Sequence, residues 1–456
     1  MKKSLYILII CLLFYAKNGL AQQTAPAQNN YSLADCIKYA YEHQDSVKNA
    51  ELDVKSADYK IKETIGTGLP QVNGSVSFQK YFQAPASVGP DFSKIASGAA
   101  LDPEAPLVKF PFGATTYTNN YGVQASQLIF SGTFIVGLQA VKTYKELYTK
   151  SLVRSKIETN VNVTKAYYQA LVSNEQIKLL DANINQLKQQ LDQTTSMNKQ
   201  GFVEKIDVDR LTVSYNNLVT NRENVARALQ LYVQMLKFQM GMPIEQQITL
   251  ADKLEDIKLD HQLAELSVDT TFYKNRIEYS LLETNVKLNM LDVKDKKAAY
   301  LPTVAANAGY TVAFEENHWR YLYNNAYPFS FIGLSINVPI FSGGQRLNQL
   351  KESQINVQKA QNDLYNAKNG FMLQATAAQV TFFNSIQSLN NQKRSQDLAQ
   401  EVLRVSKIKY QQGVGSSIEV TQAQTDLETA DNQYIQALYN ALISKVDLDK
   451  AYGRIN

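Results

Sequence analysis

The sequence predicts a mainly α-helical protein that also supplies four strands to a transmembrane β-barrel, with the whole arrangement built from one unit repeated twice. Three observations predict this fold class. Long segments without proline carry apolar residues at helical spacing, four shorter segments alternate apolar and polar residues, and the same landmarks recur in the same order in both halves. A chain of 456 residues is long enough for two copies of a large unit.

Residues 1–21 have the organisation of a secretory signal peptide. Lys2 and Lys3 precede an apolar run at 5–16, and Gly19 and Ala21 supply the small residues of a cleavage site. The run is too short to cross a bilayer as a helix, which needs about 20 residues. No later stretch is apolar over such a length. We therefore expect the mature chain to leave the cytoplasm and to contain no transmembrane helix.

The composition argues against an enzyme and against a nucleic-acid binder. The formal net charge is only +4, and Lys2, Lys3 and Lys17 of the leader account for most of the excess. Two cysteines exclude a disulfide scaffold, and three histidines leave little for a metal site or a nucleophile–base pair. No phosphate-binding glycine loop, zinc-ligand spacing or nucleophile motif appears. We expect no catalytic residue, no cofactor, no metal and no nucleic-acid partner.

Several landmarks of the first half recur in the second half in the same order. The pairs are Leu69-Pro70 and Leu301-Pro302, Ile-Phe-Ser-Gly at 129–132 and at 340–343, Gln200-Gly201 and Gln412-Gly413, and Gly241 and Gly453. The period is far longer than that of solenoid repeats, so it indicates an internal duplication. We expect a first repeat at 32–244, a linker at 245–268 and a second repeat at 269–456. The first repeat carries an additional Pro/Gly/Ala-rich insert at about 84–113.

Each half is predicted to run helix, strand, strand, long helix, helix. Ser32 begins the first helix, because Asp35 stands three residues on as the partner of a capping box. We expect this helix to continue to about Ile65, where glycines and Pro70 follow. The matching helix of the second half is expected to begin near Asp269 and to stop before the next Leu-Pro pair.

Four segments alternate apolar and polar residues as strands do, at about 71–83, 117–130, 303–315 and 329–341. In the last of them the expected apolar face carries Ile332, Leu334, Ile336, Val338 and Ile340. The polar faces are small and uncharged, as in a wet lumen, and each segment is long enough to cross a bilayer when tilted. The loop before the fourth strand is rich in aromatic residues, which gather at membrane interfaces: Trp319, Tyr321, Tyr323 and Tyr327. These features favour a membrane barrel over a soluble sandwich.

Four strands cannot close a barrel, and an open edge in lipid leaves backbone groups unpaired. The chain is therefore expected to combine its strands with those of other copies. Two copies supply 8 strands, which equals the smallest usual barrel of about 8, and three copies supply 12. The number of strands alone does not decide between an assembly of two copies and one of three.

A long helix is predicted from about 133 to 197, where the chain has no proline and Gly137 as its only glycine. Apolar residues at a spacing of three and four predict coiled-coil seams in this helix, the next one and the last one, with Arg222 as one charged interruption. Gly201 and Gly413 break the long helices at matched positions, so we expect hairpin tips at about 198–207 and 410–419. The remaining faces are rich in Gln, Asn, Ser and Thr, which suit a hydrated passage or solvent.

The sequence resembles the TolC-like outer membrane efflux protein family over essentially the whole mature chain. The residues that carry the resemblance are Tyr31 to Ile37, the two Leu-Pro-x-Val segments, the two Ile-Phe-Ser-Gly segments, and the tips Lys199-Gln200-Gly201-Phe202-Val203 and Tyr410-Gln411-Gln412-Gly413-Val414. The resemblance implies a homotrimer in outer membrane lipid, with one twelve-stranded barrel and an α-helical periplasmic tunnel. It also implies docking to a periplasmic membrane fusion (adaptor) protein and an inner-membrane pump of RND or ABC type. The channel itself would conduct passively, without catalysis.

The resemblance also implies roles for particular residues. Tyr410, Glu419 and Asp207 would belong to the periplasmic gate, although acids near helix N-termini are also favourable for purely structural reasons. Gly415 and Gln422 depart from the family's best-known member, so the gate would be less charged and latched differently. Tip turns and adaptor docking would involve Gly201, Phe202, Val203, Gly413 and Val414. Corners between helices and strands would involve Pro70, Pro302, Gly132 and Gly343.

Other classes of protein fit the sequence less well. A secreted periplasmic coiled-coil tether with a small β head would carry charged outer faces on its strands, which the sequence lacks. A stand-alone porin would need about eight or more strands in one chain. The residues leave open whether the cargo is a drug, another small toxic molecule or a polypeptide, and whether the gate is open or closed.

Overall fold

The computed structural model describes residues 30–83, 87–89, 107–110, 115–254 and 271–455, and these fall into two compact units. The helical unit comprises Met1–Lys48, Ser155–Phe272 and Met372–Asn456. The strand unit comprises Asn49–Arg154 and Tyr273–Phe371. The expected signal peptide lies outside the described residues, as do most of the 84–113 insert and the later part of the 245–268 linker.

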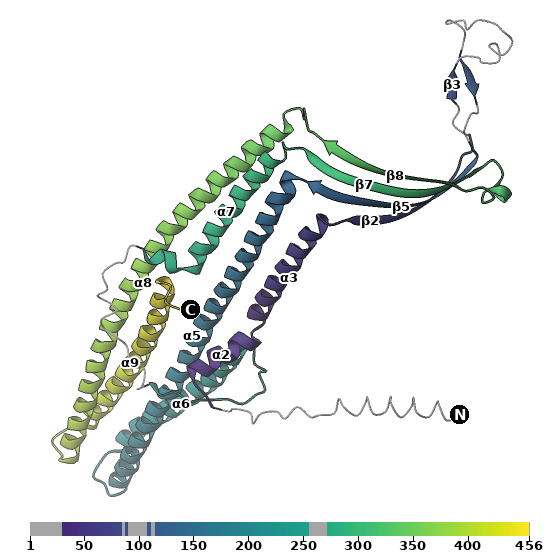
Figure 1. Cartoon of the computed structure of the whole chain (residues 1–456). Helices are drawn as coiled ribbons and strands as arrows, with labels where there is room; N and C mark the ends of the chain where they lie inside the picture. Colours follow the sequence, from purple (N-terminus) through teal and green to yellow (C-terminus); the bar gives the residue numbers. More distant parts are fainter. Residues whose placement is uncertain (1–29, 84–86, 90–106, 111–114, 255–270, 456) are drawn as a thin grey trace, which may run out of the picture. The chain divides into compact units, whose positions relative to one another are not determined.

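The strand unit contains one antiparallel sheet in the order β2-β5-β7-β8 (Figure 1). Its strands are β2 Gln71–Lys80, β5 Tyr117–Phe130, β7 Thr303–Glu316 and β8 Tyr327–Asn337. The two central strands pair along almost their whole length, with one irregularity between Leu128 and Phe130. A separate hairpin pairs β3 Ser87–Gly89 with β4 Val108–Phe110. The outer edges of β2 and β8 have no neighbouring strand within the described part of the chain.

One face of the sheet is apolar and open to its surroundings, as alternation predicts. Val76 of β2, Tyr121 of β5 and Val312 of β7 lie in one cross-strand row of this face. On β8 the side chain of Ile332 is 87% exposed. A monomeric soluble protein rarely leaves such an apolar sheet face uncovered.

The fourth strand differs from its expected position at both ends. It begins at Tyr327 and ends at Asn337, so Val338 and Ile340 follow the strand and do not extend its apolar face. The early part places Phe329 and Phe331 opposite Thr311 and Gly309, on the polar face of the sheet. The ring of Phe331 lies over Gly309, where an added Cβ would be 2.5 Å from a ring carbon. A small neighbour on β7 therefore lets an aromatic ring lie across the polar face.

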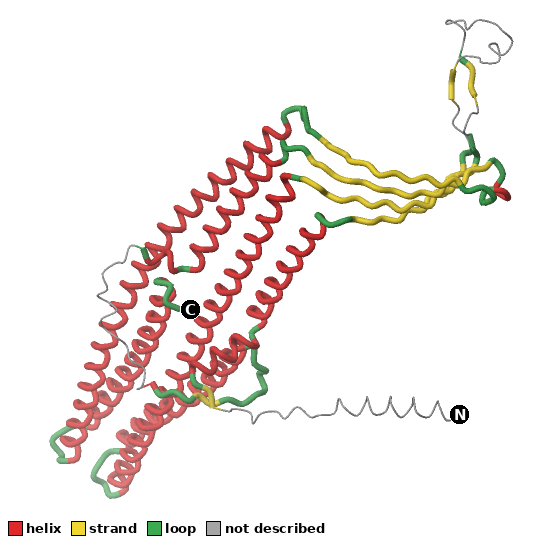
Figure 2. Tube along the Cα trace, in the orientation of Figure 1, coloured by secondary structure: helices red, strands yellow, loops and turns green. Residues whose placement is uncertain are grey.

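Four helices extend from the corners of the sheet and continue through the strand unit. They are α3 Asp45–Thr67, α5 Gly132–Lys199, α7 Ile277–Ala298 and α8 Gln345–Gln411, of which α3, α5 and α8 also reach into the helical unit. Figure 2 traces α5 and α8 as continuous helices between their end loops. Within the strand unit Glu146 of α5 pairs with Lys150 on its own helix and with Lys287 of α7.

The helical unit adds α2 Leu33–His43, α6 Lys205–Met240 and α9 Ser417–Ala451, and the short parallel pair of β1 Asn30–Tyr31 with β6 Thr249–Leu250. The expected capping box is present, because Ser32 Oγ accepts from the backbone of Asp35 and the Asp35 carboxylate accepts from Ser32. A short 3-10 helix, Phe272–Asn275, precedes α7 in the strand unit.

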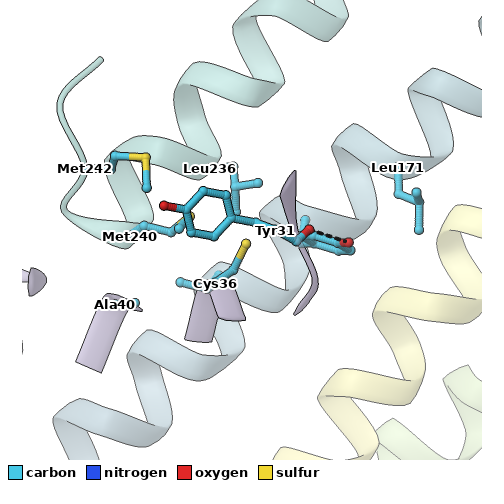
Figure 3. Close-up of a cluster of buried hydrophobic side chains, with 9 residues drawn as sticks. Tyr31, Cys36, Ala40, Leu171, Leu236, Met240 and Met242 are labelled. Carbon is cyan, nitrogen blue, oxygen red and sulfur yellow. Dashed lines mark hydrogen bonds between the residues drawn. The ribbon is translucent and has the colours of Figure 1, made fainter. Parts of the chain in front are cut away.

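A buried cluster holds α2 against α5 and α6 (Figure 3). Cys36 and Ala40 of α2 pack with Leu236 and Met240 of α6, and all four side chains are fully enclosed. Tyr167 of α5 belongs to the same cluster, and its hydroxyl donates to Asp252 at 2.8 Å. Burial raises the pKa of the Cys36 thiol to about 12, which makes it an inert core residue.

The predicted seam between α5 and α6 is confirmed. Leu180 and Leu187 of α5 form one buried cluster with Leu211 and Leu218 of α6. Arg222, the expected charged interruption, pairs with Asp181 through a 2.9 Å contact at the solvent edge of the seam.

Two helix boundaries were predicted wrongly. The first predicted helix is broken at Gln44, whose extended backbone separates α2 from α3. No proline or glycine marks this site; instead the Gln44 amide donates to the carbonyl of Gln239 near the end of α6, at 3.1 Å. The helix expected from Asp269 begins only at Ile277, after Arg276 in extended conformation. Among the described residues, no helix is both long enough and apolar enough to cross a membrane.

Candidate functional site: the two hairpin tips

Each long helix of the helical unit ends in a short loop that leads into its hairpin partner. The first tip, residues 200–204, connects α5 to α6, and the second tip, residues 412–416, connects α8 to α9. These loops contain most of the residues that the sequence singled out. Both lie inside one compact unit, so their contacts can be described together.

The two tips have the same backbone geometry. Gly201 has φ of +77° and Gly413 has φ of +74°, a region that side chains with a Cβ rarely adopt. The next residue in each loop reaches back five positions, from Phe202 N–H to Met197 at 3.0 Å and from Val414 N–H to Lys409 at 3.0 Å. This pattern closes the last turn of a helix and satisfies its carbonyls.

Each tip presents an apolar side chain directly after its glycine. Phe202 is 74% exposed in the first tip and Val414 is 75% exposed in the second. Val203 is half-buried, and its carbonyl accepts from Asn198 at 2.8 Å, which fixes the course of the first loop. The two tips therefore expose one apolar side chain each at matched points.

A hydrogen bond joins the two hairpins at their tips. The hydroxyl of Ser417, the first residue of α9, donates to the carboxylate of Asp207 in the first turn of α6. Arg210 lies 3.7 Å from the same carboxylate. Asp207 therefore has two partners and links the tip of the first half to the tip of the second.

Glu419 is placed differently from Asp207, although both lie in the first turn of their helix. Its backbone N–H is capped by the hydroxyl of Ser416 at 3.2 Å, but its carboxylate is exposed and has no ion-pair partner among the described residues. The positive end of the α9 dipole stabilises this charge without holding the side chain in place. Of the two acids, Asp207 is held by partners and Glu419 has no ion-pair partner among the described residues.

Tyr410 lies at the end of α8, where it packs on Leu403, Val420 and Leu427. Its hydroxyl is buried without a hydrogen bond of good geometry to any described residue. Burial raises the pKa of Tyr410, and the charge of Asp207 adds to the rise, while an interaction with Thr194 opposes it. Asp207, Ser417 and Tyr410 therefore lie in one neighbourhood.

The predicted corner residues lie in the strand unit, away from the tips along the chain. Pro70 and Pro302 immediately precede β2 and β7, positions where a missing N–H is tolerated. Gly132 begins α5 against the end of α7, and an added Cβ there would be 2.8 Å from Leu301. Gly343 lies in the turn between β8 and α8.

The partners that connect the tip residues leave no recognisable pattern in the sequence. Nothing in the sequence distinguishes Ser417 except its position four residues after Gly413. Lys407 was also missed, because a lysine on a polar helix is expected to face solvent. Within the described ranges no cluster of His, Cys, Asp and Glu could hold a metal ion.

Comparison with known proteins gives a family match over most of the chain. The family model described as outer membrane efflux protein matches residues 36–241 and 268–454. The chain is 24% identical to the outer membrane protein TolC of Escherichia coli K12 over 65% of its own length and 61% of TolC. It is 21% identical to the proteases secretion protein PrtF of Dickeya chrysanthemi, over 65% of the chain and 64% of that protein. These matches span less than two thirds of either relative.

A solved structure has the same fold over nearly the whole length. The outer membrane protein VceC of Vibrio cholerae superposes with a TM-score of 0.70 at 14% identity, over 92% of this chain and 96% of VceC. At that identity the likeness concerns the fold.

Proposed function

The chain belongs to the outer membrane efflux protein family and lies in the outer membrane with a large periplasmic helical part, and from this premise we propose that it is the passive outer-membrane channel of a tripartite efflux or secretion system. Its partners would be two further copies of itself, a periplasmic adaptor protein, and an inner-membrane pump of RND or ABC type. The pump would supply the energy, and this chain would supply the exit path.

The observation that carries this proposal is the four-stranded sheet with two unpaired edges and an exposed apolar face. Strands of 10 to 14 residues are long enough to cross a bilayer when tilted. In lipid the edge groups of β2 and β8 must find partners, because each unpaired backbone group costs several kcal/mol. Three copies joined from β8 to β2 would give twelve strands, with the polar faces lining a wet lumen.

The tips support a gate at the periplasmic end. Ser417 and Asp207 would hold the two hairpins of one chain together, while three copies of Glu419 would face the passage. Carboxylates brought close together repel one another and attract cations. Phe202 and Val414 would form part of the surface that receives the adaptor.

Native mass of the detergent-extracted protein tests the assembly. A trimer recovered from outer-membrane fractions is the expected result. A soluble periplasmic monomer would contradict the proposal and favour the coiled-coil tether.

Single-channel recording in planar bilayers tests the gate. Glu419→Ala is expected to weaken the preference for cations, because it removes an exposed carboxylate of the first turn of α9 that has no ion-pair partner among the described residues. Glu204→Ala is the matched control, since Glu204 is an exposed acid of the first tip whose side chain makes no capping hydrogen bond. Unchanged conductance and cation preference in Glu419→Ala would overturn the gate assignment.

The link between the hairpins can be tested without changing charge. Ser417→Ala removes the donor to Asp207, so the channel is expected to open more often than the native one. Thr425→Ala is the control, because the Thr425 hydroxyl bonds only within its own helix, to Thr421 at 3.1 Å. Equal open probability in the native channel and in Ser417→Ala would show that this bond does not hold the gate.

A further inference from the structure

A polar pocket lies between α5 and α8, just above the two tips. Its volume is about 260 Å³, and five of its lining residues are glutamines, four from α5 and one from α8. The other lining side chains are Thr194, Met197, Lys407 and Tyr410. No carboxylate lines it. We call this site the glutamine pocket.

Lys407 is the only charged group of the glutamine pocket. The side chain is half-buried, and it has no ion-pair partner among the described residues. Burial is the cause that lowers the pKa of Lys407 to about 8, and no nearby carboxylate opposes it. A half-buried ammonium without a counter-ion is costly, so this arrangement suits an anion that comes from outside the chain.

Two further buried polar atoms at the wall of the pocket are poorly satisfied within the described part of the chain. The side-chain oxygen of Gln190 is buried without a hydrogen bond among the described residues, and the buried hydroxyl of Tyr410 has only an interaction with Thr194 that lacks good hydrogen-bond geometry. A buried polar group without a partner is unusual in a folded protein and calls for an explanation. The amide of Gln190 can rotate to present its NH₂ group, and the Tyr410 hydroxyl can donate.

We infer that the glutamine pocket binds a small oxyanion, a carboxylate or a phosphate group, held by the ammonium of Lys407 together with the hydroxyl of Tyr410 and glutamine amides. All these groups can donate hydrogen bonds, and acceptors on a charged oxyanion make the strong, short kind. The volume admits a molecule of several heavy atoms, since one water occupies about 30 Å³ of liquid. Such a ligand would touch α5 and α8 together.

Calorimetric titration of the full-length protein in detergent tests the inference, with sodium phosphate and sodium succinate as separate probes. Binding of either one supports the site, and the difference between them tells whether phosphate or carboxylate is preferred. Near pH 8 binding is expected to take up protons, because the anion favours the charged form of Lys407. Two buffers of different ionisation enthalpy measure this uptake. No binding of either probe at millimolar concentration would overturn the inference.

Matched variants separate the pocket from general charge effects. Lys407→Gln is expected to weaken binding at least about tenfold and to abolish the proton uptake. Tyr410→Phe should cause a smaller loss. Lys409→Gln is the control, because Lys409 lies two residues further along the same helix and is exposed. An equal loss in Lys407→Gln and Lys409→Gln would overturn the inference.

The ligand also has a consequence for opening, and this part alone rests on the proposed function. A bound anion bridges the long helices of both hairpins, so phosphate or succinate on the periplasmic side should lower the open probability of the native channel and leave that of Lys407→Gln unchanged. If the anion binds in calorimetry but open probability does not change, the pocket stands and the link to gating fails. If no channel forms at all, calorimetry still tests the pocket.

Discussion

The two hairpins of the helical unit end in the same turn but bury different side chains. Between α5 and α6 the contact is made by leucines, among them Leu187 and Leu218, which are almost completely buried. Along α9 many of the buried positions are alanines: Ala423, Ala430, Ala437 and Ala441. The duplicated unit has therefore kept its tip turn, while its second hairpin buries small side chains beside large ones such as Leu403 and Leu427.

The second hairpin also buries polar groups beside its apolar contacts. Gln424 of α9 is 3% exposed, and neither its amide oxygen nor its nitrogen has a hydrogen-bond partner among the residues that the structure describes. Asp431 accepts from Gln396 at 2.8 Å and from Asn183 of α5 at 2.7 Å. Burial and the nearby Asp431 raise the pKa of Glu428 on the same helix. The α8–α9 hairpin therefore combines an apolar cluster with buried polar groups, whereas the cluster between α5 and α6 consists of leucines, so we expect α8–α9 to separate at lower cost.

Truncating a leucine of the first seam should have the largest effect. Leu187→Ala is expected to reduce the free energy of unfolding by about 2–5 kcal/mol, because the side chain is fully buried and leaves a cavity. Urea unfolding followed by far-ultraviolet circular dichroism measures this. Leu231→Ala, at an exposed position of α6, should change it by less than about 0.5 kcal/mol. A loss below about 1 kcal/mol in Leu187→Ala would mean that the seam is not what stabilises this hairpin.

A substitution in the second hairpin should change the free energy of unfolding in the opposite direction. Gln424→Leu removes two buried polar atoms without partners, so it is expected to raise the free energy of unfolding by about 1–3 kcal/mol. Gln422→Leu is the control, because Gln422 is exposed and bonds Asp426 on its own helix. Destabilisation in Gln424→Leu would show that the glutamine is satisfied in solution, and the contrast between the hairpins would disappear.

The pH dependence of the free energy of unfolding should reveal what it costs to bury the ammonium of Lys407. Its pKa is about 8 in the folded chain, and an unfolded lysine titrates near about 10.4, so the unfolded state binds more protons between these values. Stability contributed by this site should therefore rise with pH across that window, by at most about 1.4 kcal/mol per pH unit. The difference between native protein and Lys407→Gln isolates this rise, with Tyr410 as the neighbouring titrating group. A difference that does not vary with pH would contradict the burial of Lys407.

The smallest expected losses in the free energy of unfolding come from substituting the tip glycines, and they should be equal in the two tips. Gly201→Ala and Gly413→Ala should each cost about 1 kcal/mol, because both glycines have positive φ and open space around the added Cβ. Gly137→Ala, inside α5, should instead stabilise by about 0.5–1 kcal/mol. Thermal unfolding of the three variants measures the comparison. Unequal costs at the two tips would mean that the loops differ in solution.

The long helices and the strand segments could be predicted because each depends on a local pattern. The alternation at 117–130 defines β5, and the absence of helix breakers defines α5. The glycines of the tips were found in the same way, since a positive φ restricts the residue type. The break at Gln44 could not be found, because it depends on a bond to α6 far along the chain. The early part of β8 was missed because its aromatic side chains suit either face until Gly309 makes room for one of them.

The sequence by itself determined the duplicated order of elements, the strand alternation, the coiled-coil seams and the positions of the tip turns. Each of these follows from period, propensity or the conformational freedom of glycine, which act over a few residues. Only the tertiary structure decided which acid is held and which is free. Asp207 and Glu419 occupy equivalent places in sequence, yet the first meets Ser417 and the second meets no ion-pair partner in the described chain. Such pairing depends on how two hairpins approach each other, and contacts at that separation leave no periodic trace in the chain.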